Sequence, residues 1–222
     1  MKVVCIIQAR LASTRLPKKV LADLRGRPLL WRVVERAKKI NGVEEVVVVV
    51  PRCDLFEIQR HVPIVQCLPG SPIDVLDRYH HAARDVDADV VIRVTGDCPL
   101  LSPEFAGEVV GRFVGTGADY VHNSGPNTDG LDAEAFTRKA LDAAWWEADD
   151  RECWEHVGPF FLRNRGRFGI QHVDAPTWWP GPKLSVDTKE DLGRVRRIYE
   201  RLAEGRFSLR DTLAAWELAG RP

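Results

Sequence analysis

Two runs of β-branched residues constrain the fold of this chain more than any other feature of its sequence. Residues 3–7 and 46–50 are apolar at every position, so both faces of each run have to be covered. Strands that are buried on both faces are typical of parallel sheets flanked by helices. Shorter apolar runs predict further strands at 62–67, 90–94, 119–122 and 184–186.

Helix signals lie between these strands. Pro28 opens a segment whose apolar side chains share one helical face, and Ser71 and Ser102, each followed by proline, are the expected N-caps of two further helices. Four more helices are expected at 137–148, 151–164, 188–204 and 208–219, after a turn at 125–130. Strands that alternate with helices predict an α/β fold with a mostly parallel, doubly wound sheet.

Length and composition narrow the classes of protein that the chain can belong to. The 222 residues fit a single α/β domain, 1–222, and 32 basic residues balance 32 acidic ones, so overall charge favours neither nucleic acid nor a membrane as partner. The five cysteines include no CxxC pair, which indicates neither a disulfide framework nor a zinc site. No apolar run is long enough for the core of a signal peptide or for a membrane span. We therefore expect a soluble, cytoplasmic protein.

Positive charge is concentrated near the N-terminus. Residues 1–40 contain 11 Lys or Arg against 2 acids, whereas the remaining residues contain 21 against 30. Arg32, Arg36, Lys38 and Lys39 are expected on the solvent face of a helix. Another four, Arg10, Arg15, Lys18 and Lys19, lie with two hydroxyl residues in the acid-free connection 8–19 that follows the first strand. A buried strand that leads into a basic, hydroxyl-rich loop is suited to holding a polyphosphate.

The position of each acid relative to the strands separates candidate ligands from surface charges. Ligands of open α/β sheets bind outside the carboxyl ends of the strands. Asp97 directly follows the strand at 90–94, and Asp187 follows the segment 184–186, so the two carboxylates could share a Mg²⁺ ion that bridges to phosphates. An N-cap of the helix 188–204 is the alternative role for Asp187. Asp85, Asp87 and Asp89 precede a strand and are expected in a solvated helix end and turn at the opposite edge.

Two common nucleotide motifs are missing from the sequence. It contains no GxxxxGK[ST] loop, which excludes a P-loop ATPase. It also has no GxGxxG after the first strand, which argues against a dinucleotide-binding dehydrogenase.

The phosphate-loop candidate resembles a known signature. Its sequence, Gln8-Ala9-Arg10-Leu11-Ala12-Ser13-Thr14-Arg15-Leu16-Pro17-Lys18-Lys19, is similar to the A-R-x-G-S-x-R-L-P-x-K motif of sugar-acid cytidylyltransferases. Its Gln-Ala-Arg start and its Ser-Thr-Arg look most like the branch named for spore-coat polysaccharide biosynthesis protein F. Similar blocks follow in family order at 96–100, 129–134, 155–157 and 186–192. The resemblance implies a three-layer α/β/α, Rossmann-like nucleotidyltransferase fold of the GT-A-like type.

The resemblance also implies an activity. By this resemblance, the chain is expected to be a Mg²⁺-dependent cytidylyltransferase. In the expected reaction, an oxygen of a sugar acid or related anionic acceptor attacks the α-phosphorus of CTP, and pyrophosphate leaves. The implied catalytic residues are Arg10, Lys19 and Asp97, and Mg²⁺ would be held by Asp97 and Asp187. The nucleotide would be bound by Ala9, Arg10, Ser13, Arg15, Lys19, Thr95 and Gly96. The acceptor would be bound by Asn123, Asp129, Asp132, Glu134 and His156.

Two other functions stay open from the sequence: a non-catalytic nucleotide- or sugar-binding module, and a GT-A-like glycosyltransferase. Ala12 and Lys18 stand where the family loop usually has glycine, and Ala12 fits only if its φ is negative. The resemblance makes 123–183 an insertion that serves the acceptor, and a candidate homodimer contact. Its expected helices carry three tryptophans, Trp145, Trp146 and Trp154.

Overall fold

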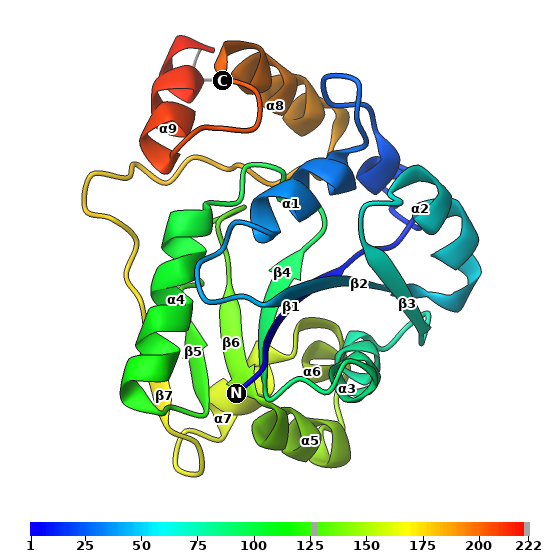
Figure 1. Cartoon of the computed structure of the whole chain (residues 1–222), viewed down its shortest axis with the longest axis vertical. Helices are drawn as coiled ribbons and strands as arrows, with labels where there is room; N and C mark the ends of the chain where they lie inside the picture. The colour runs from blue at the N-terminus through cyan, green and yellow to red at the C-terminus, as the bar shows by residue number, and fades with distance from the viewer. Residues whose placement is uncertain (126–127, 220–222) are drawn as a thin grey trace.

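The computed structural model describes residues 1–125 and 128–219, and in this part of the chain seven strands form one sheet (Figure 1). The strand order is β3-β2-β1-β4-β6-β5-β7. The only antiparallel pairs among these strands are those that β6 makes with β4 and β5. The strands are β1 Val3–Gln8, β2 Glu45–Pro51, β3 Gln66–Gly70, β4 Val90–Thr95, β5 Tyr120–His122, β6 Glu134–Thr137 and β7 Ile170–His172. Residues 126 and 127 of the expected turn lie outside the described ranges.

Helices cover both faces of this sheet. The longer ones are α1 Leu29–Ala37, α2 Leu55–His61, α3 Val75–Asp85, α4 Pro103–Thr116, α5 Arg138–Glu147, α8 Lys189–Arg201 and α9 Leu209–Leu218. The short ones are η1 Lys19–Leu21, η2 Arg52–Asp54, α6 Arg151–His156 and α7 Gly158–Arg163. Figure 1 shows α3, α5 and α6 grouped on one side of the sheet and α1 with α8 and α9 on the other. No helix in the described ranges is long and apolar enough to cross a membrane.

The alternation of side chains along β1 divides the interior into two cores. Val4 and Ile6 pack in the core beneath α3, α5 and α7, whereas Cys5 and Ile7 pack in the core beneath α1, α4 and α8. Because successive residues of a strand point to opposite faces, an all-apolar run is what a sheet between two helical layers requires. The expected three-layer α/β/α fold with a mostly parallel sheet is confirmed.

Two strand predictions need correction. The strand expected at 62–67 lies at β3, because Val62 is the C-cap of α2 and donates its N–H to the carbonyl of Ile58. The segment 184–186 forms no strand. Its backbone instead pairs with two loops, Leu184 N with Asp129 O at 2.9 Å and Val186 N with Asp97 O at 2.9 Å. The sheet is completed by β6 and β7, which are too short to produce a periodic sequence signal.

Two helix predictions also need correction. The helix expected at 151–164 breaks into α6 and α7 at Val157, whose φ is +61°. Ser71 does not cap α3, because that helix begins at Val75 and its N-cap is Asp74, which accepts from the Asp77 N–H at 2.8 Å. Ser102 does cap α4 and accepts from the Phe105 N–H at 3.1 Å.

The two serines give a matched test of these caps. Ser102→Ala removes a cap acceptor and is expected to lower the free energy of unfolding by about 1 kcal/mol. Ser71→Ala removes only a turn contact and is expected to cost less than about half of that. Urea unfolding followed by circular dichroism measures both values. Equal losses in the two variants would contradict the assignment of Asp74, rather than Ser71, as the N-cap of α3.

Candidate active site

A cavity of about 720 Å³ opens at the edge of the sheet where β1 and β4 end. Its walls come from the connection 9–19, from α3, and from the loops 129–132 and 185–187. Twelve of the predicted site residues line it: Ala9, Arg10, Ser13, Arg15, Lys19, Thr95, Gly96, Asp97, Asp129, Asp132, His156 and Asp187. Segments that are far apart in the sequence therefore converge at the edge where a ligand of an α/β sheet is expected.

An ionic cluster joins three of these segments. The Lys19 ammonium lies 2.7 Å from Asp97 Oδ2 and 2.9 Å from Asp187 Oδ1. Asp187 is also 2.9 Å from the guanidinium of Arg15 and 2.9 Å from the ammonium of Lys183. The two carboxylates predicted to hold a metal thus already share one cation, Lys19, whose side chain is only 13% exposed.

The pKa directions of Lys19 and Asp187 favour the charged form of each group. Burial lowers the pKa of Lys19, but the charges of Asp97 and Asp187 outweigh it, so the pKa ends above the ordinary value. Burial raises the pKa of Asp187, but Lys19 and Lys183 outweigh that effect and leave it below the ordinary value. Opposite charges at hydrogen-bond distance stabilise the ionised form of each partner.

Backbone contacts shape the connection 9–19. Ala9 N donates to Val49 O at 3.0 Å, and Leu11 N donates to the Asp54 carboxylate at 2.8 Å. Lys18 adopts a φ of +56°, the conformation that the usual glycine would adopt without strain, whereas Ala12 is not among the residues with positive φ. Of the two departures from the family loop, Lys18 is therefore the strained one.

Gly96 and Gly130 occupy positions that admit no side chain. A Cβ on Gly96 would lie 2.8 Å from the carbonyl oxygen of Gln8. A Cβ on Gly130, whose φ is +90°, would lie 2.5 Å from the backbone nitrogen of Ser185. The two glycines let the loops that carry Asp97 and Asp187 approach neighbouring backbone closely.

The start of α8 holds Asp187 in place. Thr188, not Asp187, is the N-cap of α8, so the alternative role for Asp187 is wrong. Asp191 Oδ2 accepts from the backbone N–H groups of Asp187 and Thr188 at 3.0 and 3.1 Å, and also contacts Lys183 at 2.9 Å. A capping box therefore fixes the backbone of Asp187 and leaves its carboxylate free for the cluster.

Two predicted acceptor residues do not reach the cavity. Asn123 is fully buried, and its amide donates to Leu131 O at 3.2 Å and accepts from Ala133 N at 2.7 Å. Glu134 stands at the correct edge of the sheet, but its carboxylate is bound by Arg93 at 2.7 Å and by the Tyr120 hydroxyl at 2.8 Å. Both side chains are held by internal partners, so we withdraw them as acceptor ligands.

The opposite wall of the cavity carries acids and a histidine. Asp132 accepts from the Thr128 hydroxyl at 2.8 Å, and burial raises its pKa to about 6 despite that bond. Glu155 lies 3.5 Å from the guanidinium of Arg10, and it precedes His156 at the end of α6. Carboxylates and an imidazole are groups that can form hydrogen bonds with hydroxyls.

Several residues of the cavity escaped prediction. Arg93 had a signal, because it is a cation inside an otherwise apolar strand, and Glu155 lies in the family block 155–157, whereas Arg78 looks like an ordinary helix residue. Cys98 also lines the cavity, and burial holds the pKa of its thiol well above the ordinary value. That thiol is therefore protonated and packs beside Asp97.

The carboxylate oxygens of the cavity fit a hard divalent cation only if a bound ligand supplies further oxygen atoms. Asp97 and Asp187 offer carboxylate oxygens around a single cation position, as the bound Lys19 shows. The described residues contain no group of three or more His, Cys, Asp and Glu side chains that could hold a metal. Mg²⁺ is commonly bound by one or two carboxylates together with phosphates and water, so two carboxylates suffice if a polyphosphate completes the shell.

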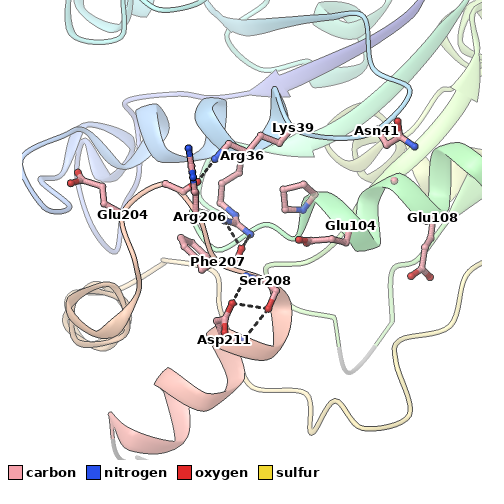
Figure 2. A pocket seen from close by; sticks show the side chains of 13 residues that line it. Arg36, Lys39, Asn41, Glu104, Glu108, Glu204, Arg206, Phe207, Ser208 and Asp211 are labelled. Atoms are coloured by element: carbon pink, nitrogen blue, oxygen red, sulfur yellow. Dashed lines mark hydrogen bonds between the residues drawn. The ribbon is translucent and has the colours of Figure 1, made fainter.

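A second, larger cavity of about 870 Å³ lies between α1, α4 and the α8–α9 connection (Figure 2). Arg36 is buried there, donates to the carbonyls of Leu101 and Phe207, and lies over the Phe207 ring. Arg32 is buried as well, so the expected solvent-facing position is wrong for both arginines, which bind loop carbonyls instead. None of the predicted site residues lines this cavity.

Solved structures of nucleotidyltransferases share this architecture. A cytidylyltransferase from Leptospira borgpetersenii superposes with a TM-score of 0.89 at 27% identity, over 98% of this chain and 94% of that one. CMP:2-keto-3-deoxy-manno-octonic acid synthetase, solved with CTP, gives 0.68 at 22% identity over 88% and 97%. Rv0371C of Mycobacterium tuberculosis, solved with manganese, gives 0.63 at 16% over 88% and 98%. The last two show a common fold alone.

The family model described as cytidylyltransferase matches residues 4–199, and the chain belongs to this family. It is 34% identical to the uncharacterized protein MJ1063 of Methanocaldococcus jannaschii, over 86% of this chain and 81% of that protein. It is 29% identical to spore coat polysaccharide biosynthesis protein SpsF of Bacillus subtilis, over 90% and 87%. It is 27% identical to 3-deoxy-manno-octulosonate cytidylyltransferase of Proteus mirabilis, over 84% and 82%. The predicted family is thereby confirmed, and the chain is a nucleotidyltransferase enzyme.

Asp132 gives the protein a testable dependence of stability on pH. Its folded-state pKa of about 6 lies above the ordinary value of 3.8, so ionisation between these values destabilises the folded protein. Asp132→Asn keeps a neutral side chain, and its stability relative to the wild type is expected to increase from about pH 4 to about pH 7. Urea unfolding across this range measures the difference. A difference that stays constant with pH would contradict the raised pKa.

Proposed function

We propose that the protein is a Mg²⁺-dependent cytidylyltransferase that joins CMP from CTP to a sugar acid or related anionic acceptor and releases pyrophosphate. Family membership and relatives named for sugar-acid and polysaccharide chemistry support this proposal. The observation that carries it is the cluster of Lys19, Asp97 and Asp187 at the end of a basic loop. The cluster combines a phosphate-binding cation with two carboxylates suited to a divalent ion.

The cations of the loop would bind the triphosphate by exchanging partners. Arg10 is paired with Glu155, Arg15 with Asp187, and Lys19 with both carboxylates in the described structure. The triphosphate can compete for these cations, because it carries several negative charges along one chain and each carboxylate carries one. We expect the three side chains to turn to the phosphates when the nucleotide enters.

The chemical step needs positioning and neutralisation of charge. The acceptor hydroxyl gives its proton to water while its oxygen forms a bond to the α-phosphorus, and the bond from that phosphorus to the bridging oxygen of pyrophosphate breaks. Mg²⁺ held by Asp97 and Asp187 would neutralise phosphate charge. Arg15 and Lys19 would stabilise the charge on the departing pyrophosphate, and Asp129, Asp132 and His156 would orient hydroxyls of the acceptor.

One assay tests the reaction against its alternatives. Pyrophosphate release is measured with each nucleoside triphosphate, Mg²⁺ and a panel of sugar acids and phosphonates. The proposal predicts release with CTP that depends on one class of anionic acceptor. Binding of nucleotide without release on any acceptor would instead indicate a binding module, and sugar transfer from a ready-made nucleotide sugar would indicate a glycosyltransferase.

A substitution of Asp97 is the sharpest single-residue test of the proposed reaction. Asp97→Asn keeps the size of the side chain but removes the charge, and turnover is expected to fall at least ~10²-fold, the scale of removing one transition-state stabiliser. The matched control is Asp87→Asn, because Asp87 is exposed in a turn at the opposite edge of the sheet and pairs only with Arg138 among the described residues. Steady-state kinetics with CTP measure both. An Asp97→Asn enzyme as active as the control would remove Asp97 from the reaction.

We also propose that 1–222 functions as one domain in which 123–183 serves the acceptor and a homodimer contact. Trp146 on α5 is 76% exposed and Trp154 on α6 is 37% exposed, although large apolar side chains are normally covered. Sedimentation equilibrium is expected to show a dimer in the wild type and a weaker dimer in Trp146→Glu. A wild-type protein that sediments as a monomer would contradict the dimer contact without affecting the proposed reaction.

A further inference from the structure

Asp54 is a buried acid beside the active-site loop, and its carboxylate serves that loop rather than its own helix. Asp54 stands at the N-cap of α2, where an aspartate normally accepts a hydrogen bond from the first turn of the helix. In the described structure its side chain accepts from no N–H of α2. Its Oδ2 instead accepts from the backbone N–H of Leu11 at 2.8 Å, across 43 positions of the sequence.

The bond between Leu11 and Asp54 is shielded from water. Asp54 is only 8% exposed, and its Oδ1 lies 3.5 Å from the thiol of Cys53. It forms no ion pair within residues 1–125 and 128–219. A buried carboxylate needs hydrogen bonds in place of the water that it has lost, and a bond from an N–H to a charged oxygen is stronger than one between neutral groups. We therefore expect Asp54 to hold Leu11 firmly.

Packing does little to hold the loop that follows Leu11. Of residues 11–18, only Leu16 is buried. Residues 12–15 line the active-site cavity, and three of these four are exposed. The part of the loop that would face a ligand therefore has no core behind it, and its shape depends on the hydrogen bonds at its two ends.

The 3₁₀-helix η2 and the helix α2 hold both ends of this loop. Lys18 N donates to Leu11 O at 3.0 Å, so these two residues close the loop. Asp54 holds the Leu11 end, and Glu57 lies 2.7 Å from the ammonium of Lys18 at the other end. The Lys18 side chain is 61% exposed, and ion pairs at the surface contribute little. Asp54 is therefore the main anchor.

We propose that Asp54 is a positioning residue that fixes the loop 11–18 in the shape that receives the triphosphate. This inference rests on the proposed function, in which the loop binds the phosphates of CTP. Asp54 is not among the described residues that line the cavity, so it acts through Leu11. A loop that is held in its binding shape before the ligand arrives loses less conformational freedom on binding. Releasing Leu11 would weaken phosphate binding without changing any group that touches the phosphates.

Two variants of Asp54 test the proposal. Isothermal titration measures the affinity for pyrophosphate and for CTP with Mg²⁺, and NMR hydrogen exchange follows the Leu11 N–H. Asp54→Ala removes the acceptor, so both affinities are expected to fall about tenfold or more, the scale of one hydrogen bond to a charged group, and Leu11 N–H to exchange faster. Asp54→Asn keeps an acceptor oxygen, so its affinities are expected to stay within about threefold of the wild type.

A second aspartate supplies the control for a loss of stability alone. Asp211 accepts from the backbone N–H of Ser208 at 2.8 Å at the start of α9, and it is not among the described residues of the active-site cavity. Asp211→Ala is expected to lower the free energy of unfolding and to leave the affinity for pyrophosphate unchanged. If Asp54→Ala does not fold, Asp54→Leu decides, because it keeps a branched side chain of similar size without an acceptor.

Two results would overturn the proposal. An Asp54→Ala protein that binds pyrophosphate and CTP as the wild type does would reject Asp54 as a positioning residue, whatever the exchange rate at Leu11. Equal losses of affinity in Asp54→Ala and Asp54→Asn would mean that the charge of Asp54 matters and its hydrogen bond does not. A wild type that binds neither pyrophosphate nor CTP would instead reject the proposed function, while faster exchange at Leu11 in Asp54→Ala would still show that Asp54 holds the loop.

Discussion

The site depends on the ammonium of Lys19 lying between the carboxylates of Asp97 and Asp187. Two carboxylates at one edge of a sheet repel each other. Lys19 neutralises this repulsion at 2.7 and 2.9 Å from the two oxygens. It thereby joins the loop after β1, the end of β4 and the segment before α8, which are far apart in the sequence. The cavity exists because these three segments are held together.

The same cluster explains how the cavity can be both stable and reactive. The cations of the loop are paired with acids of the protein, so the cavity has little unbalanced charge. The triphosphate and a divalent ion would bring their own opposite charges, and the partners can be exchanged without a large electrostatic cost.

The strands of the sheet were predictable from the sequence where their apolar runs were long. The apolar runs at 3–7, 46–50 and 90–94 mark β1, β2 and β4 to within one residue, because only strands covered on both faces need them. The strands β6 and β7 are four and three residues long, so no period could reveal them. The break at Val157 was also unpredictable, since a buried valine with positive φ is imposed by tertiary contacts.

Within the site, the position of each residue along the sheet edge was easier to predict than its partners. The edge rule placed Asp97, and Asp187 lies beside it and shares Lys19 although 184–186 is not a strand. The family motif located the loop 9–19, but it could not show that Glu134 is bound by Arg93 or that Asn123 is held by backbone groups. Arg78 has no sequence signal at all, because its burial is a property of the folded chain.

The most direct test of the account is a crystal structure of the protein with CTP and Mg²⁺. The account predicts that Lys19 and Arg15 leave the carboxylates and contact phosphate oxygens, while Asp97 and Asp187 bind the metal. A complex in which Lys19 still lies between the two carboxylates, with the nucleotide bound elsewhere, would contradict it.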